Sequence, residues 1–377
     1  MRDARGVVVR GRGAPARIEP ITIGHPEGTE VLVRVVANGV CHSDLWAIQN
    51  GNWGSPFPML LGHEGAGVVE AVGADVTHVE QGDRVLLAWA MPCGTCPACL
   101  RGRPRRCAHA WDQPARLHAD DGSRLIGTLS IGSMATHTVV HGAQTVRIPD
   151  GVDLVEACLL GCGASTGIGA AVNTGGVTAG DTVAVIGLGG IGLSVLLGAA
   201  MAGATRIIAI DRIAAKLDTA LALGATDVID AGVDDVVTAV RALTDTGVDV
   251  AFEATGNAAV VSQAVAMLAR GGTAVAIGVP APDSTVTIAW GETNIGAAYP
   301  NKATLKITDG GDPVAEDFVA WLEAAAGRRL DLRPLVSVIA PFTDEALSDA
   351  FRAMLAGEVI RTVVAIEDPG PDAGAGS

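Results

Sequence analysis

The sequence predicts an α/β protein with two domains, one rich in β-strands and one built on a doubly wound parallel sheet. The chain has 377 residues, which is long enough for two domains of ordinary size. Before residue 150, short strands such as 7–9, 31–37, 65–72 and 82–87 alternate with glycine turns, a pattern typical of a barrel-like β domain. From Gly180 onward strands and helices alternate instead, which indicates a parallel sheet covered by helices.

The first strand–helix–strand unit of that second part carries a glycine-rich loop. A strand over 181–186 runs into GLGGIG, followed by a helix over 191–201 and a second strand over 206–211. Glycines at this spacing permit a tight turn, let the backbone approach a pyrophosphate and leave the phosphates facing a helix N-terminus. The candidate dinucleotide-binding residues are Gly187, Gly189, Gly190, Ile191, Gly192, Asp211 and Arg212. A carboxylate at Asp211 can accept from a ribose 2′-hydroxyl and repels a 2′-phosphate, which favours NAD over NADP.

Further strands and helices are expected from the same kind of sequence pattern. Further strands are expected over 225–230, 248–253 and 272–279, and helices over 313–326 and 344–356. A last strand is expected over 360–366, and the glycine- and proline-rich segment from 367 to the end is expected to be disordered.

Three side chains that can ligate a metal stand at separate points of the chain. Cys41 lies in GVCHSD, His63 in GHE, and Cys162 in GCG, a short way before the glycine loop. Two thiolates and one imidazole can hold Zn²⁺ and leave the fourth corner of the tetrahedron open, which is the ligand count of a catalytic zinc. Zinc that polarises an oxygen beside a nicotinamide predicts hydride transfer.

Four further cysteines form a tighter cluster in sequence. Cys93, Cys96, Cys99 and Cys107 are joined by two CxxC steps and one longer spacing. Four thiolates close a tetrahedron with no open corner, so the segment 93–107 is predicted to hold a structural zinc. The seventh cysteine, Cys158, is interpreted as a small core residue.

Charge and composition exclude several classes of partner. The formal net charge is −15, which argues against a nucleic-acid or anionic-membrane partner. The N-terminus does not resemble a signal peptide, and the most apolar stretch, 183–202, is the one that carries the glycine loop. A cytoplasmic protein is therefore expected, and its seven cysteines are better explained by metal than by disulfides.

Together these motifs resemble the zinc-dependent medium-chain alcohol dehydrogenase family over about residues 7–366. The resemblance rests on GVCHSD, GHEGAGVVEAVG, the four-cysteine lobe, GCGASTGIGAA, GLGGIG with Asp211, and Ile360-Arg361-Thr362. It is nearest to the branch of thiol-adduct formaldehyde dehydrogenases and bacterial primary-alcohol dehydrogenases. It implies a GroES-like catalytic domain (1–163, returning over 309–377) around a Rossmann NAD-binding domain (164–308), in a homodimer or homotetramer.

The resemblance also implies roles for individual residues. Cys41, His63 and Cys162 would bind the catalytic zinc, Asp44 would orient His63, and Glu64 would lie behind the metal. Ser43 would take the proton of the alcohol, because a hydroxyl both donates and accepts. Trp46 stands where some members have a relaying histidine, and its indole is a donor only. The cofactor would be contacted by His42 and Arg361 at the pyrophosphate and by Thr166 at the nicotinamide.

The substrate pocket is expected to be lined by tryptophan. Its candidate walls are Trp46, Trp53, Trp89, Leu125 and Ile126. Aryl, allylic or terpenoid-like primary alcohols would suit such walls, although the rings could equally shrink the site to small alcohols or fill the core.

Three alternatives remain open at this point. The first is a thiol-adduct formaldehyde dehydrogenase; loop 51–58 has no acidic residue, which counts against glutathione and leaves mycothiol. The second is a nicotinoprotein that never releases NAD. The third, of another class, is a non-catalytic regulator that binds zinc and a nucleotide.

Overall fold

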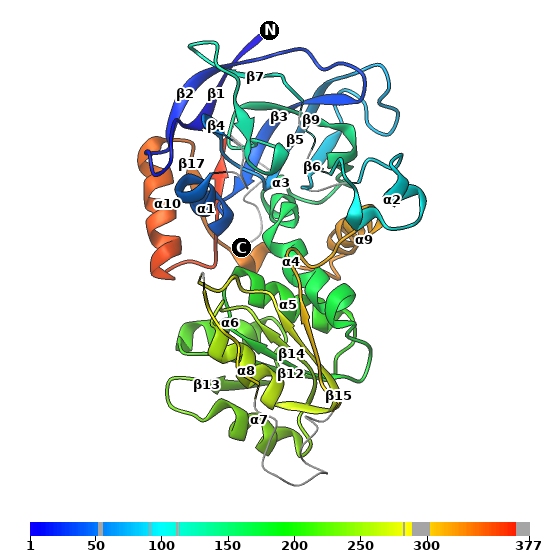
Figure 1. The fold of residues 1–377 in the computed structure, drawn as a ribbon, viewed down its shortest axis with the longest axis vertical. Coiled ribbons are helices and arrows are strands. Elements are labelled where there is room, and N and C mark those ends of the chain that lie inside the picture. The colour runs from blue at the N-terminus through cyan, green and yellow to red at the C-terminus, as the bar shows by residue number, and fades with distance from the viewer. Residues whose placement is uncertain are drawn as a thin grey trace. The chain divides into compact units, whose positions relative to one another are not determined.

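The chain folds into two units, each with its own β-sheets and hydrophobic core (Figure 1). The computed structural model describes residues 1–51, 56–89, 92–110, 112, 114–281, 283–288 and 302–366. The first unit comprises Met1–Cys162 together with Val314–Ser377, and the second comprises Gly163–Pro313. Trp53 and the tail from residue 367 lie outside the described residues.

One sheet of the first unit is built around the N-terminal strand. Its order is β7 (Leu117–Ala119), β2 (Arg17–Ile23), β1 (Arg2–Val9), β4 (Met59–Leu60) and β8 (Ile126–Gly127). The run Val7, Val8, Val9 is fully buried, so both faces of this end of β1 are covered.

The other sheet of the first unit is built around β3 (Glu30–Gly39). Its order is β10 (Thr145–Arg147), β6 (Arg84–Leu87), β5 (Gly65–Val72), β3, β18 (Arg361–Ala365) and β17 (Val336–Pro341), and β9 (His137–His141) also pairs with β3. Val363 of β18 lies opposite Gly39, two residues before the first predicted zinc ligand. This pairing brings the C-terminal strand beside the segment that carries Cys41.

Short helices complete the first unit. They are α1 (His42–Asn50), α2 (Pro97–Leu100), α3 (Leu154–Ala157), α9 (Ala315–Ala326) and α10 (Asp344–Ala356), with 3₁₀ turns η1 (Pro104–Arg106), η2 (Thr128–Ser130), η3 (Gly142–Gln144), η4 (Cys158–Gly161) and η6 (Arg333–Leu335). Helix α10 has well-defined ends, because the Thr343 hydroxyl accepts from Ala346 N and Gly357 takes a left-handed conformation.

The second unit is a six-stranded parallel sheet with helices packed on it (Figure 1). The strand order is β13 (Asp227–Asp230), β12 (Arg206–Asp211), β11 (Thr182–Ile186), β14 (Val248–Glu253), β15 (Leu268–Ala276) and β16 (Thr304–Ile307). The helices are α4 (Gly163–Gly169), the π-helical η5 (Ala170–Gly175), α5 (Gly190–Met201), α6 (Ala214–Ala222), α7 (Val236–Thr244) and α8 (Ala258–Ala266). The predicted doubly wound α/β sheet is confirmed.

No single helix among the described residues is long and apolar enough to cross a membrane. One pair of helical segments with a bend between them, 154–161 and 163–175, is long and apolar enough when taken together. Buried core helices often share this length and composition.

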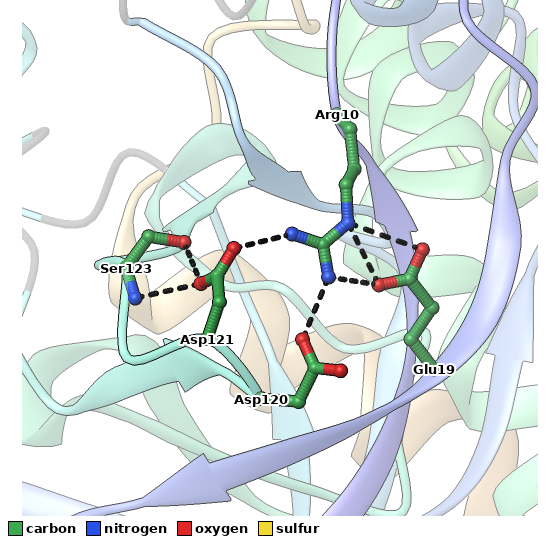
Figure 2. Close-up of polar contacts among 5 residues, drawn as sticks. All are labelled: Arg10, Glu19, Asp120, Asp121 and Ser123. Atoms are coloured by element: carbon green, nitrogen blue, oxygen red, sulfur yellow. Dashed lines mark hydrogen bonds and ion pairs between the residues drawn. The ribbon is translucent and has the colours of Figure 1, made fainter.

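A network of charged side chains stabilises the edge of the five-stranded sheet (Figure 2). Arg10 donates to Glu19 of β2 at 2.5 Å, to Asp120 at 2.8 Å and to Asp121 at 2.8 Å. Ser123 donates to Asp121 from both its backbone nitrogen and its hydroxyl, and these hydrogen bonds are the main reason that the pKa of Asp121 is lowered. One guanidinium thus joins β2 to the turn that follows β7.

Glu156 of α3 gives the first unit a pH-dependent stability. Burial, assisted by the nearby Asp153 carboxylate, raises the pKa of Glu156 to about 7, and Arg333 Nε is 3.9 Å away. Because the folded-state pKa exceeds the unfolded value of about 4.3, the folded form holds an extra proton between these pH values. The stabilising contribution is therefore complete below about pH 4 and is lost as the pH rises through 7.

Glu156→Gln is expected to remove this dependence. The variant should match the wild type near pH 4 and exceed its free energy of unfolding at pH 8 by about 2 kcal/mol, since it carries no charge to bury. Urea denaturation at both pH values measures this, with exposed Glu316→Gln as the matched control. Parallel pH profiles for Glu156→Gln and wild type would contradict the assignment.

Candidate active site

A cluster of four ligand-type side chains is formed within the first unit. Cys41 is the N-cap residue of α1 and lies two residues after the end of β3, His63 and Glu64 lie between β4 and β5, and Cys162 follows η4. One ligand atom from each of these side chains lies within 4.8 Å of the others. The structure therefore brings together Cys41, His63 and Cys162, which are far apart in sequence.

Asp44 holds two of these ligands in place. Its carboxylate is fully buried and accepts from Cys41 N at 3.1 Å, Gly62 N at 3.3 Å and His63 Nδ1 at 3.1 Å. The same side chain thus closes the capping box of α1 and fixes the imidazole ring. With the proton on Nδ1, the lone pair of His63 is on Nε2, which is buried and has no hydrogen-bond partner among the described residues.

Glu64 and Arg361 form a buried ion pair beside this cluster. Arg361, at the start of β18, donates from Nη2 to Glu64 Oε2. A side chain at Gly39 would put its Cβ 2.0 Å from Glu64 Oε2, so glycine is needed there to make room for the carboxylate. Burial raises the pKa of Glu64 to about 7, although the guanidinium of Arg361 opposes this shift.

The electrostatics of the cluster favour a cation at its centre. A hydrogen bond between the two thiols lowers the pKa of Cys41 and raises the pKa of Cys162. Burial alone would lower the pKa of His63, but Asp44 and Cys41 more than offset burial and raise it well above its ordinary value. Two sulfur atoms and one free ring nitrogen therefore converge where positive charge is stabilised, and this donor set fits Zn²⁺ with one corner left for another ligand.

The four remaining predicted ligands also come together. One sulfur each from Cys93, Cys96, Cys99 and Cys107 lies within 4.8 Å of the others. The Sγ of Cys96 is 3.5 Å from that of Cys99 and 3.9 Å from that of Cys107. A tetrahedral zinc with Zn–S bonds of about 2.3 Å requires sulfur separations of about 3.8 Å. The lobe therefore fits a closed four-thiolate zinc site.

The glycine loop of the second unit has the geometry expected of a dinucleotide-binding turn. Gly189 is the N-cap residue of α5, and a Cβ at Gly192 would lie 1.8 Å from Gly187 O. Asp211 accepts from Leu188 N at 2.7 Å and, through its other oxygen, from Arg212 N at 2.7 Å. These bonds fix the end of β12 against the loop, which the sequence did not indicate.

The remaining predicted site residues occupy varied positions. On α1, His42 is exposed and Ser43 is half-buried, whereas Thr166 of α4 is buried and Arg212 is exposed.

The predicted pocket walls do not share one environment. Trp46 of α1 is 38 % exposed, and Leu125 is packed in the core beside the five-stranded sheet. Trp89 is half-buried and packs against a cluster that includes Val31 and Leu87. Ile126 lies on β8 and is half-buried.

Family models match both units of the chain. The "Alcohol dehydrogenase GroES-like domain" matches residues 27–150, and the "Zinc-binding dehydrogenase" domain matches residues 190–324.

Relatives of known name match over nearly the full length. A geraniol dehydrogenase of Castellaniella defragrans is 34% identical over 96% of this chain and 97% of its own length. An S-(hydroxymethyl)glutathione dehydrogenase of Photobacterium damsela subsp. piscicida is 34% identical over 96% of this chain and 99% of its own length. The crystal structure of benzyl alcohol dehydrogenase from Acinetobacter calcoaceticus superposes with a TM-score of 0.86 at 30% identity, covering 97% of this chain and 100% of that one. The resemblance expected from the sequence is thereby confirmed, and the chain belongs to the zinc-dependent medium-chain alcohol dehydrogenase family, oxidoreductases that act on CH–OH groups.

Proposed function

We propose that this protein transfers hydride reversibly between a primary alcohol and NAD, with a catalytic zinc held by Cys41, His63 and Cys162. The observation that carries the proposal is the buried convergence of two thiols with a ring nitrogen that has no other partner among the described residues. A second zinc held by Cys93, Cys96, Cys99 and Cys107 would stabilise the lobe. When bound, the catalytic zinc supplies Lewis-acid polarisation of the substrate oxygen.

The residues around this cluster have separate tasks in the proposed reaction. Asp44 keeps the proton of His63 on Nδ1, so that Nε2 stays available as a ligand. Arg361 balances the negative charge of Glu64, so that the carboxylate can remain buried beside the thiolates. Ser43, half-buried on α1, accepts the hydroxyl proton of the alcohol and passes it toward water. Trp46 cannot extend this relay, and His42, exposed one residue before Ser43, can.

The second unit would bind the dinucleotide. Its glycine loop and the N-terminus of α5 are suited to the pyrophosphate, and Asp211 to the adenosine ribose. Thr166 would pack near the nicotinamide, with His42, Arg212 and Arg361 as further cofactor contacts. We assign residues 1–163 and 309–377 to the catalytic domain and 164–308 to the NAD-binding domain.

The substrate proposed is an aryl, allylic or terpenoid-like primary alcohol. The names of the geraniol and benzyl alcohol dehydrogenases among its relatives support this class. A panel from methanol to a ten-carbon alcohol, with benzyl alcohol and geraniol, tests it with wild type and Trp89→Ala. Equal kcat/KM across the panel, unchanged by Trp89→Ala, would contradict a pocket shaped by tryptophan.

A second candidate is thiol-adduct formaldehyde oxidation. The similarity to an S-(hydroxymethyl)glutathione dehydrogenase favours it. Formaldehyde oxidation that requires added glutathione or mycothiol would establish this activity in place of simple alcohol oxidation.

We further propose a cytoplasmic homodimer or homotetramer. Strand β16 forms one edge of the described parallel sheet, and on it Ile307 is 82% exposed and Leu305 is 37% exposed. An apolar strand edge of this kind is suited to pairing with a second copy. Light scattering should give two or four times the chain mass of 38.0 kDa, and a monomer would contradict the proposal.

Asp211→Ala is expected to shift the cofactor preference toward NADP. The change removes an acceptor for the ribose hydroxyls and the charge that repels a 2′-phosphate, so the ratio of kcat/KM for NAD over NADP should fall about tenfold or more. Asp230→Ala is the matched control, because Asp230 ends the neighbouring strand β13 opposite Asp211. A wild-type enzyme that prefers NADP, or an unchanged ratio in Asp211→Ala, would contradict the role of Asp211.

A further inference from the structure

Glu253 is a buried carboxylate whose two oxygens have different surroundings. The side chain is fully buried. Its Oε1 accepts from Thr255 N at 2.6 Å, from Gly256 N at 2.8 Å and from the Thr255 hydroxyl. Its Oε2 is also buried and has no hydrogen-bond partner among the described residues. One oxygen therefore accepts three hydrogen bonds, and the other accepts none from the described residues.

Glu253 lies at the end of the parallel sheet where sheets of this kind usually bind a ligand. Glu253 ends β14 and lies opposite Ile186, which ends β11. Strand β12 pairs with one side of β11 and β14 with the other, so the direction of winding reverses between β11 and β14. The crevice at the carboxyl ends of strands at such a reversal is the usual dinucleotide site.

The turn that Oε1 holds is in contact with the glycine loop. A Cβ at Gly187 would lie 2.6 Å from Cγ2 of Thr255, so the methyl group of Thr255 is packed directly against this glycine. The Thr255 hydroxyl also accepts from Asn257 N at 3.2 Å, and Asn257 is the N-cap residue of α8. Glu253 thus fixes a turn that forms part of the wall beside Gly187.

Anchoring this turn requires only one oxygen, and it does not explain the second. A buried acceptor without a partner costs free energy, and the cost is larger when the group is charged. A donor from outside the described residues would remove that cost. A dinucleotide bound at this end of the sheet would offer such donors, from its hydroxyl and amide groups or through a water molecule that it fixes.

We propose that Glu253 is a positioning residue for the dinucleotide with one task for each oxygen. Oε1 holds the 254–257 turn against Gly187, and Oε2 accepts a hydrogen bond from the bound dinucleotide, directly or through one water molecule. This inference rests on the proposed NAD-dependent function. It adds a residue that no sequence motif indicated, since the only signal in VDVAFE is a glutamate at the end of the strand.

Glu253→Gln separates the two tasks, with NADH as the probe. The amide oxygen of glutamine can still accept from the turn, but its NH₂ group replaces Oε2 with a donor. The Kd for NADH, measured by fluorescence titration, should therefore rise about fivefold or more while the Tm stays near that of wild type. Asp249→Asn is the matched control, because Asp249 lies on the same strand but at the opposite end of the sheet. There its carboxylate accepts a hydrogen bond from Thr182 N at 2.8 Å. It should leave the Kd unchanged.

Thr255→Val is the complementary variant and decides the question if Glu253→Gln does not fold. It removes one donor to Oε1, keeps a methyl group beside Gly187 and leaves Oε2 as it is. The Tm should fall, and the Kd for NADH should rise by clearly less than the roughly fivefold expected for Glu253→Gln, because Oε2 is unchanged.

Two results would overturn the proposal. They are wild-type affinity in Glu253→Gln, or a Kd that rises in Thr255→Val in proportion to the loss of stability. Failure of the proposed function would appear instead in the wild type, as an absence of binding to both NADH and NADPH.

Discussion

Replacing Cys162 with serine is expected to abolish alcohol oxidation and to leave a folded protein with about one zinc per chain. The cluster at Cys41, His63 and Cys162 supplies two sulfur ligands, and serine removes one without changing the size of the side chain much. A neutral hydroxyl is a far poorer ligand for zinc than a thiolate, so the metal should be lost from this site. Turnover should fall by at least about 10⁴-fold, because polarisation of the substrate oxygen depends on the metal.

Metal content and activity measured together test this expectation. Zinc per chain, determined by atomic emission, should fall from about two to about one in Cys162→Ser, with little change in Tm. Cys96→Ser is the informative comparison, because Cys96 belongs to the closed lobe. It should also lose one zinc, yet its main effect should be on Tm. Full activity with two zinc ions in Cys162→Ser would show that the ligand assignment is wrong.

Local sequence patterns were sufficient for the family, the fold class and several elements. The strand over 65–72, the strand over 248–253 and the helix over 344–356 were predicted with the bounds that the structure has. The ends of such segments are marked by residues that favour chain turns or helix caps, as Thr343 and Gly357 mark the two ends of α10. The candidate zinc ligands could be named because Cys and His at these spacings have few other uses.

Pairings between distant segments could not be predicted in the same way. The contact of Glu64 with Arg361 depends on β18 lying beside β3, and strand order is set by the packing of the whole unit. The hydrogen bonds from Leu188 and Arg212 to Asp211 likewise depend on the loop closing over β12. Glu253 belongs to the same class, because the burial of its carboxylate is visible only once both neighbouring strands are in place.

Asp44→Ala is expected to weaken zinc binding and to destabilise the first unit at the same time. Three donors, Cys41 N, Gly62 N and His63 Nδ1, would lose their common acceptor in a fully buried place. Loss of a carboxylate that orients a ligating histidine typically costs about 10–100-fold in metal affinity. The unsatisfied buried donors should lower the free energy of unfolding by at least about 2 kcal/mol.

Competition with a chelator and chemical denaturation measure the two effects separately. The control is Asp112→Ala, because Asp112 accepts from His109 Nδ1 at 2.8 Å in an equivalent pair, and both side chains are more than half exposed. Solvent can replace that bond, so zinc retention and stability should both stay near wild type. If Asp44→Ala keeps the catalytic zinc as firmly as Asp112→Ala does, Asp44 does not orient His63.

Asp44→Asn then shows which of the two tasks of Asp44 dominates. Its amide has one acceptor oxygen, so it can serve His63 Nδ1 or Cys41 N, while its NH₂ group must face a donor. If the oxygen serves His63, zinc affinity should be largely kept and α1 should lose its cap, which lowers the Tm. If it serves Cys41, the Tm should be kept and zinc affinity should fall. Because Nε2 of His63 must face the metal, we expect the first result, a zinc affinity near that of wild type with a lowered Tm.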